Sequence, residues 1–257
     1  ERAGFPLTFM SGFAVSASRL GLPDSGLISY GEMVDQGRNI CSAVAIPVIG
    51  DADTGYGNAL NVRRTVEGYA RAGFACAMIE DQLAPKRCGH TRGKEVVPRA
   101  EALTRIRAAV DAREAGANLL IMARTDARFP EGLDEALERA RAFADLGADI
   151  VFVEAPRSEA EMERVCKEIQ LPQLANMVEG GDTPVLPPAR LEELGYKIVA
   201  YPLTLLNAAT RAMNEALAAL TKGTTPDGLL SFAELRELVG FDAYDESLAK
   251  YRDGNDE

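Results

Sequence analysis

The chain has 257 residues, 47% of them hydrophobic, and a formal net charge of −11. Such a chain can bury a large core and should fold as an ordinary globular protein. Its negative charge argues against nucleic acid or an anionic membrane as a partner, and no apolar run approaches the ~18 residues of a transmembrane helix.

Seven short apolar runs predict strands, and they follow one another along the chain at regular intervals. Their apolar residues are continuous rather than alternating, which is typical of parallel strands that are covered on both faces. The runs lie at residues 6–10, 46–50, 74–80, 117–124, 148–154, 172–178 and 196–202.

Amphipathic stretches between these runs predict helices with well-marked ends. Asn58 and Ser158 are expected N-caps, and Pro98 begins a helix between them. Before four of the strands the chain leaves a helix through glycine, in "AGF", "AGA", "LGA" and "LGY". This repetition predicts an α/β fold, a (β/α)8 barrel of the TIM type with C-terminal helices. Because such a barrel has eight strands, we expect the first one to lie upstream of residue 1.

The end of the chain departs from this repetition. We expect residues 1–222 to form the catalytic barrel and residues 223–257 to form a C-terminal helical extension that packs on a neighbouring subunit. The Ala-rich stretch "LNAATRAMNEALAAL" and the tail helix both suggest buried subunit contacts.

The cysteines indicate the redox environment. They contain no CxxC pair, which favours free thiols in a cytoplasmic protein, although spacing alone leaves two distant disulfides open. They are Cys41, Cys76, Cys88 and Cys166.

Polar side chains collect where the predicted strands end, and in a barrel that rim carries the chemistry. Any one of them alone is more often a helix cap or a loop ion pair than a catalytic group. Their recurrence at the same position on successive strands favours an active site. In chain order they are Ser11, Gly12, Asp51, Asp53, Glu80, Asp81, Arg124, Glu154, Asn176 and Glu179.

Three of these carboxylates predict a metal site. Asp51, Asp53 and Glu80 would repel one another unless a cation neutralises them or their pKa values rise. Mg²⁺ prefers carboxylate oxygens and keeps several waters, so it needs few protein ligands. Zinc is disfavoured, because His90 is the only histidine in the chain. We therefore expect Mg²⁺, with Mn²⁺ as a substitute.

The loop after the strand at 74–80, "DQLAPKRCGHTRGKEVVPR", is basic in an acidic chain. It predicts a mobile flap that closes on an anionic ligand, and a solvated basic loop is the alternative. Within it, Cys88 beside Gly89 and His90 is a candidate proton donor or nucleophile. The basic side chains are Lys86, Arg87, Arg92, Lys94 and Arg99.

Six segments carry a resemblance to a known family. They are "SGFAVSASRLGLPDSG", "GDADTGYGN", "IEDQLAPKRCGH", "ARTDAR", "VFVEAP" and "ANMVEGG", in this order along the chain. The chain resembles the isocitrate lyase / phosphoenolpyruvate mutase superfamily over nearly its whole length. "KRCGH" together with "DADTGYG" is typical of the lyase branch. "NMVEGG" followed by "TP" resembles the subgroup of 2,3-dimethylmalate lyase, petal death protein and oxaloacetate hydrolase.

The resemblance implies roles for the residues around the metal. Asp53 resembles the principal Mg²⁺ ligand, and Asp51 and Glu80 resemble residues that hold metal-bound water. Cys88 resembles the proton donor of a gating loop. The other members of that loop are Lys86, Gly89 and His90.

The resemblance also implies which residues meet the substrate, a small anionic 2-oxo or 2-hydroxy carboxylate. Ser11 and Gly12 resemble donors to its carboxylate, joined by Arg124. Asp24 resembles a catalytic support close to the substrate. The distal part of the substrate would face Glu154 and Asn176.

Two positions depart from the family's pattern. Phe9 replaces a tyrosine thought to be catalytic, and Phe13 fills space beside the carboxylate site. The identity of the general base is therefore open, and a metal-bound water held by Asp51 or Glu80 is the base that we expect. Phe13 and the stretch with Thr204 and Leu205 should shape the pocket.

The resemblance implies a magnesium-dependent carbon–carbon lyase, usually a homotetramer that exchanges a C-terminal helix. It would cleave a substituted malate or a related 2-hydroxy diacid, of the 2,3-dimethylmalate or 2-methylisocitrate type, into a 2-oxo acid and a carboxylic acid. An oxaloacetate hydrolase or decarboxylase is the alternative, followed by a phosphonopyruvate or phosphoenolpyruvate mutase-type enzyme. A barrel that binds a metabolite without catalysis is the alternative outside enzymes.

Overall fold

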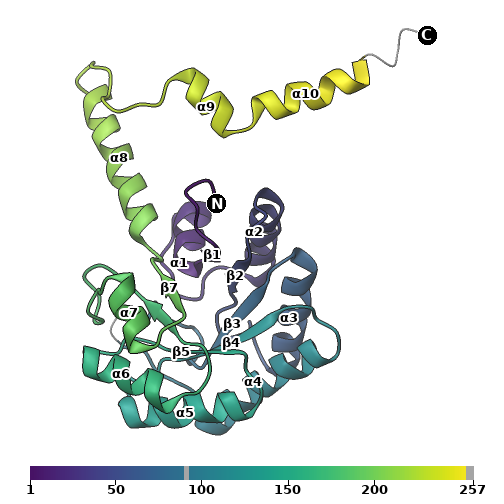
Figure 1. Ribbon diagram of the computed structural model, residues 1–257, viewed down its shortest axis with the longest axis vertical. Helices are drawn as coiled ribbons and strands as arrows, with labels where there is room; N and C mark the ends of the chain where they lie inside the picture. Colours follow the sequence, from purple (N-terminus) through teal and green to yellow (C-terminus); the bar gives the residue numbers. More distant parts are fainter. Residues whose placement is uncertain (90–92, 253–257) are drawn as a thin grey trace. The chain divides into compact units, whose positions relative to one another are not determined.

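Seven strands alternate with helices in the part of the chain that the computed structural model describes, residues 1–89 and 93–252 (Figure 1). Each strand falls inside or within a residue of a run that the sequence predicts. The strands are β1 (Thr8–Met10), β2 (Val48–Asp51), β3 (Cys76–Glu80), β4 (Leu120–Thr125), β5 (Ile150–Val153), β6 (Leu174–Asn176) and β7 (Ile198–Ala200). The helices are α1 (Gly12–Val15), the π-helix η1 (Ser16–Leu20), α2 (Tyr30–Ala43), α3 (Ala59–Ala72), α4 (Arg99–Glu114), α5 (Leu133–Asp145), α6 (Glu159–Glu168), α7 (Pro188–Leu194), α8 (Thr204–Leu220), α9 (Phe232–Leu238) and α10 (Phe241–Arg252).

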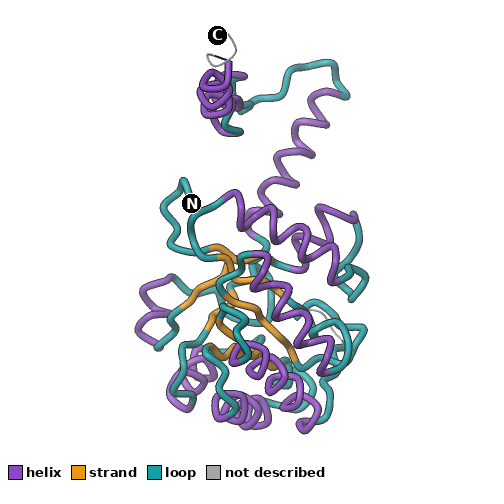
Figure 2. Tube along the Cα trace, turned by 90° about the vertical axis from the view of Figure 1, so that its right-hand side faces the viewer, coloured by secondary structure: helices purple, strands orange, loops and turns teal. Residues whose placement is uncertain are grey.

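The strands are parallel and adjacent in chain order. β1 to β5 form one sheet and β6 pairs with β7, and a parallel bridge between Val151 and Gln173 connects the two sets. Helices surround the strands (Figure 2). All carboxyl ends of the strands therefore point to one rim, as the sequence predicts for an α/β fold of this type.

Local chemistry sets the helix ends that the sequence predicts. The side chain of Asn58 accepts from the N–H groups of Leu60 and Asn61 at the start of α3. Ser158 caps α6 in the same way. Gly73 ends α3 at φ 98°, a left-handed conformation that glycine adopts without a Cβ clash.

Alternate strand residues face two different cores. In β3, Cys76 and Met78 belong to an inner cluster between the strands, whereas Ala77 and Ile79 pack with the outer helices. Burial raises the pKa of Cys76 to about 12, so this thiol stays protonated in the inner cluster. Because side chains alternate between the two faces of a strand, one set of residues fills the inside of the barrel and the other set packs against the surrounding helices.

The chain divides into two compact units, Glu1–Leu206 and Asn207–Glu257. The sequence placed a division after residue 222, whereas the division falls within α8. None of the side chains of α8 is buried among the described residues. In the described chain, no helix is both long and apolar enough to cross a membrane.

Two glycines of α2 give a matched test of core packing. A Cβ on Gly37 would lie 2.1 Å from Cζ of Phe74, whereas a Cβ on Gly31 meets nothing closer than 3.9 Å. We expect Gly37→Ala to lower the free energy of unfolding by about 1–3 kcal/mol, because Phe74 must move inside a filled core. Gly31→Ala should raise it by up to about 1 kcal/mol through helix propensity. Urea denaturation measures both, and equal effects would contradict this packing.

Candidate active site

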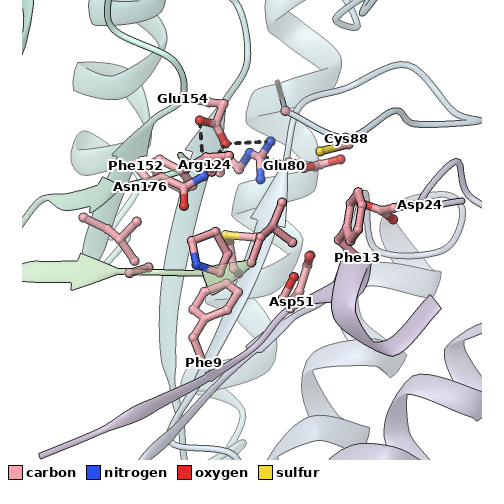
Figure 3. A pocket seen from close by; sticks show the side chains of 18 of the residues that line it. Phe9, Phe13, Asp24, Asp51, Glu80, Cys88, Arg124, Phe152, Glu154 and Asn176 are labelled. Carbon is pink, nitrogen blue, oxygen red and sulfur yellow. Dashed lines mark hydrogen bonds and ion pairs between the residues drawn. The ribbon is translucent and has the colours of Figure 1, made fainter. Parts of the chain in front are cut away.

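One pocket lies at the rim where the strands end, and most of the predicted site residues line it (Figure 3). In Figure 3, Glu154 and Asn176 lie across the pocket from Asp51 and Phe13. The predicted residues that line it are Ser11, Phe13, Asp24, Asp51, Glu80, Lys86, Cys88, Gly89, Arg124, Glu154 and Asn176. Gly12 and Asp53 lie directly behind this lining, and His90 lies outside the described residues.

Asp51 anchors the loop that follows β2. Its Oδ2 accepts from the N–H of Gly12 at 3.0 Å, and its Oδ1 accepts from the N–H of Asp53 at 3.1 Å. A Cβ on Gly12 would lie 2.8 Å from Asp51 Oδ2, so the contact needs glycine there. Behind the loop, the buried hydroxyl of Tyr69 donates to the carbonyl oxygen of Asp51 at 2.7 Å. These bonds fix the Asp51 carboxylate and the backbone of Asp53 relative to the start of α1.

Lys86 joins two of the predicted site carboxylates. Its Nζ lies 2.5 Å from Asp24 Oδ1 and 2.8 Å from Asp53 Oδ1, and all three side chains are buried. Burial raises the pKa of Asp53 to about 7, despite the attraction of Lys86. Burial alone would lower the pKa of Lys86, but Asp53 and the neighbouring carboxylates raise it well above its usual value. Lys86 therefore stays charged.

Arg124, at the end of β4, is held by carboxylates on three sides. Asp126 binds it with two contacts, Nε to Oδ2 at 2.8 Å and Nη2 to Oδ1 at 3.0 Å. Glu154 Oε2 lies 3.0 Å from Nη2, and Glu80 Oε2 lies 3.3 Å from Nε. Asn176 donates to Glu154 Oε2 at 3.2 Å. This planar clamp orients the guanidinium at the pocket wall.

The carboxylates at this rim fit a hard divalent cation. Oε1 of Glu80 is buried without a hydrogen-bond partner in the described structure, and burial raises the pKa of Glu80 well above its usual value. Within the described residues, no three acidic, thiol or imidazole groups converge into a complete ligand set. A metal at this rim would therefore take few direct ligands from Asp51, Asp53 and Glu80 and would keep water among the others, as Mg²⁺ does.

The basic loop is turned inward at two of its lysines. Lys86 and Lys94 are buried, and Lys94 Nζ lies 3.3 Å from Asp126 Oδ1. Arg99 begins α4 and pairs with Glu135 on α5. The interpretation as a solvated loop is therefore wrong for the two lysines, since both neutralise buried carboxylates.

Sequence reasoning missed part of the site. Asp126, which the sequence did not single out, contacts Arg124, and Lys94, expected only as a side chain of the basic loop, contacts Asp126. Of the stretch that was expected to shape the pocket, Pro202 and Leu203 line it, whereas Thr204 and Leu205 do not, and Leu205 is 82% exposed. The side chains that form its apolar wall with Phe13 are Phe9, Met78, Phe152, Leu174, Val178, Ala200, Pro202 and Leu203.

Known proteins resemble this chain over most of its length. The family model for phosphoenolpyruvate phosphomutase matches residues 1–221. The chain is 47% identical to 2,3-dimethylmalate lyase of Eubacterium barkeri over 257 residues, covering 98% of this chain and 89% of the relative. It is 42% identical to 2-methylisocitrate lyase of Aeropyrum pernix, covering 96% and 80%.

Solved structures share the fold. A crystal structure of 2,3-dimethylmalate lyase has a TM-score of 0.93 at 37% identity and covers 97% of this chain and 85% of that one. Oxaloacetate acetylhydrolase with the inhibitor 3,3-difluorooxalacetate also reaches 0.93 at 37% identity, covering 100% and 88%. Phosphonopyruvate hydrolase with oxalate and Mg²⁺ reaches 0.85 at 31% identity, covering 97% and 88%. The predicted fold class is confirmed.

The support behind Asp51 can be tested without touching the pocket. Tyr69→Phe removes the donor to the Asp51 carbonyl, which then stays buried and unpaired. We expect the free energy of unfolding to fall by about 1–3 kcal/mol. Tyr201 is 38% exposed, so Tyr201→Phe should have an effect within about 0.5 kcal/mol. Similar losses in the two variants, measured by denaturant titration, would contradict this assignment.

Proposed function

The chain belongs to the phosphoenolpyruvate mutase/isocitrate lyase superfamily, and from this premise we propose that it is a magnesium-dependent carbon–carbon lyase. Its substrate would be a substituted malate or a related 2-hydroxy diacid of the 2,3-dimethylmalate or 2-methylisocitrate type. One observation carries the proposal: Cys88, the only thiol among the described pocket-lining residues, shares the pocket with Asp51, Glu80 and Arg124. The proposed proton donor and the proposed cation site would thus line the same pocket.

The metal would sit on the carboxylates of the rim. Asp53 would be the principal ligand, and Asp51 and Glu80 would hold its water ligands. When bound, the cation supplies charge that lowers the pKa of the substrate 2-hydroxyl and orients the adjacent carboxylate. The partnerless Oε1 of Glu80 and the excess of acidic oxygens support this assignment.

Substrate binding would use both sides of the pocket. Ser11 would donate to the carboxylate next to the reacting hydroxyl, together with Arg124, and Gly12 would do so once its N–H leaves Asp51 Oδ2. Glu154 and Asn176 would face the far end of the substrate. Phe9 and Phe13 give the pocket an apolar wall, which suits alkyl substituents better than a further charge.

The cleavage needs a base, an electron sink and an acid. A base on the carboxylate side of the pocket would take the hydroxyl proton. Glu80 Oε1 lies on that side and accepts no hydrogen bond in the described structure. As the C2–C3 bond breaks, C2 becomes the carbonyl of a 2-oxo acid, and the electron pair moves onto the carboxylate-bearing C3 fragment. The loop cations that line the pocket, Lys86 and Arg87, would stabilise that enediolate. Cys88 would then protonate its carbon, and the thiolate would recover a proton from the base.

Hydrolysis of oxaloacetate to oxalate and acetate is the second candidate. The structural likeness to oxaloacetate acetylhydrolase equals that to 2,3-dimethylmalate lyase, with a TM-score of 0.93 for each. The hydrated carbonyl of oxaloacetate would then take the place of the substrate alcohol in the same site. A phosphonopyruvate or phosphoenolpyruvate mutase-type activity ranks behind both.

Turnover distinguishes these candidates. Proton NMR with Mg²⁺ should show a 2-oxo acid and a carboxylic acid arising from dimethylmalate or methylisocitrate, and EDTA should abolish both products. Cys88→Ser should lower the rate by about 10²-fold or more, because the protonating group is lost, whereas Cys41→Ser should leave it unchanged. Oxalate and acetate from oxaloacetate would shift the function to the hydrolase. Unchanged turnover in EDTA would contradict the metal dependence.

We also propose that the protein is a cytoplasmic homotetramer. In the second compact unit many large apolar side chains are exposed on α9 and α10, which suits contact with another subunit. Light scattering after size-exclusion chromatography should give about four times the chain mass of 27.6 kDa. A particle of one chain mass would contradict the assembly.

A further inference from the structure

Lys94 is a buried cation that the proposed chemistry does not use. Its side chain is 1% exposed, although it follows a polar, basic loop. Burying an ammonium group costs free energy unless partners surround it, so the partners of Lys94 indicate which parts of the site this side chain holds together.

The partners of Lys94 belong to two different parts of the site. Its Nζ donates to the carbonyl oxygen of Gly89, in the loop that carries Cys88, and lies 3.3 Å from Asp126 Oδ1. It also lies 5.3 Å from the centre of the Phe129 ring, an apolar cover on the same side. A single ammonium group therefore connects the thiol loop to the end of β4.

Both ends of that connection lead to Arg124. Asp126 makes two contacts to its guanidinium. Gly89 packs so closely that a Cβ there would lie 2.4 Å from Arg124 Nη2 and 2.5 Å from Glu154 Oε2. The loop backbone thus packs against the Arg124–Glu154 ion pair. Among the described cations, Lys94 joins the carbonyl of Gly89 to the carboxylate of Asp126.

We propose that Lys94 is a positioning residue that fixes Gly89, and with it the Cys88 thiol, against Arg124. The proposal rests on the proposed function only for its effect on turnover. Without the ammonium group, the Gly89 carbonyl loses its donor and Asp126 loses one of its two cations. The loop then has less to hold it on Arg124, and the thiol moves away from the reacting carbon.

Alkylation of Cys88 tests this position in the free protein. Lys94→Met keeps the length and most of the volume of the side chain and removes the charge. We expect iodoacetamide to modify Cys88 about tenfold faster in this variant, because the loop opens more often. Peptide mass spectrometry resolves each cysteine, and the rates at Cys41 and Cys166 should stay within about twofold. On the substrate that the wild type cleaves, kcat should fall by about 10–10²-fold with a much smaller change in KM, since a small misplacement weakens only the reacting geometry.

The controls separate positioning from loss of fold. Lys167→Met removes an exposed lysine that pairs with Glu163 on α6, and it should change neither the alkylation rate nor kcat. Lys94→Gln keeps a donor for the Gly89 carbonyl, so its alkylation rate at Cys88 and its kcat should lie between those of Lys94→Met and the wild type. If Lys94→Met does not unfold cooperatively, Lys94→Gln is compared with the wild type in its place. An alkylation rate at Cys88 within twofold of the wild type in a folded Lys94 variant would overturn the proposal. Absence of turnover in the wild type would overturn the proposed function instead, and the alkylation rates would still decide the role of Lys94.

Discussion

The balance of buried charge at the rim of the barrel controls the arrangement of this site. In the described part of the chain, acidic side chains outnumber basic ones in the cluster around the pocket. Its carboxylates are Asp24, Asp51, Asp53, Glu80, Asp126 and Glu154, and its cations are Lys86, Lys94 and Arg124. Buried charges cost several kcal/mol unless opposite charges and hydrogen bonds compensate them. Lys86 and Arg124 are each shared between carboxylates, and Lys94 joins Asp126 to the carbonyl of Gly89. These contacts fix the loops that carry the charged groups, and the remaining negative charge favours a divalent cation.

This constraint extends into the backbone around the site. Gly12 and Gly89 stand where a Cβ would collide with Asp51 or with the Arg124–Glu154 pair. One layer further out, Asp81 accepts from Thr125 and Asp126 and pairs with a buried arginine of α5 at 3.2 Å. The ends of β3 and β4 are thus tied together beneath the pocket, which fixes Glu80 and Arg124 at the ends of these strands.

Much of the fold could be predicted from the sequence, because it follows from local chemistry. Apolar runs, N-caps such as Asn58, and glycines such as Gly73 act within a few residues, and the structure confirms the elements that they mark. The rim residues could be predicted from their place at the strand ends. The contacts of Lys94 with Asp126, 32 residues apart, could not, because charge pattern alone does not say whether a lysine points inward. Nor could the apolar wall of the pocket, since its members come from five different strands and the loops after them. The division of the chain within α8 likewise depends on tertiary contacts that no local signal carries.

Direct measurement of Mn²⁺ binding tests the central claim that these carboxylates form a divalent-cation site. Electron paramagnetic resonance of free Mn²⁺ during titration gives the bound ion per chain for the wild type, Asp53→Asn and Asp134→Asn. Asp134 is 89% exposed at the side chain and lies on α5, so it serves as the control. The account predicts one ion per chain in the wild type and in Asp134→Asn, and binding weakened by about tenfold or more in Asp53→Asn, which lacks an anionic ligand. Equal binding in all three proteins would contradict it.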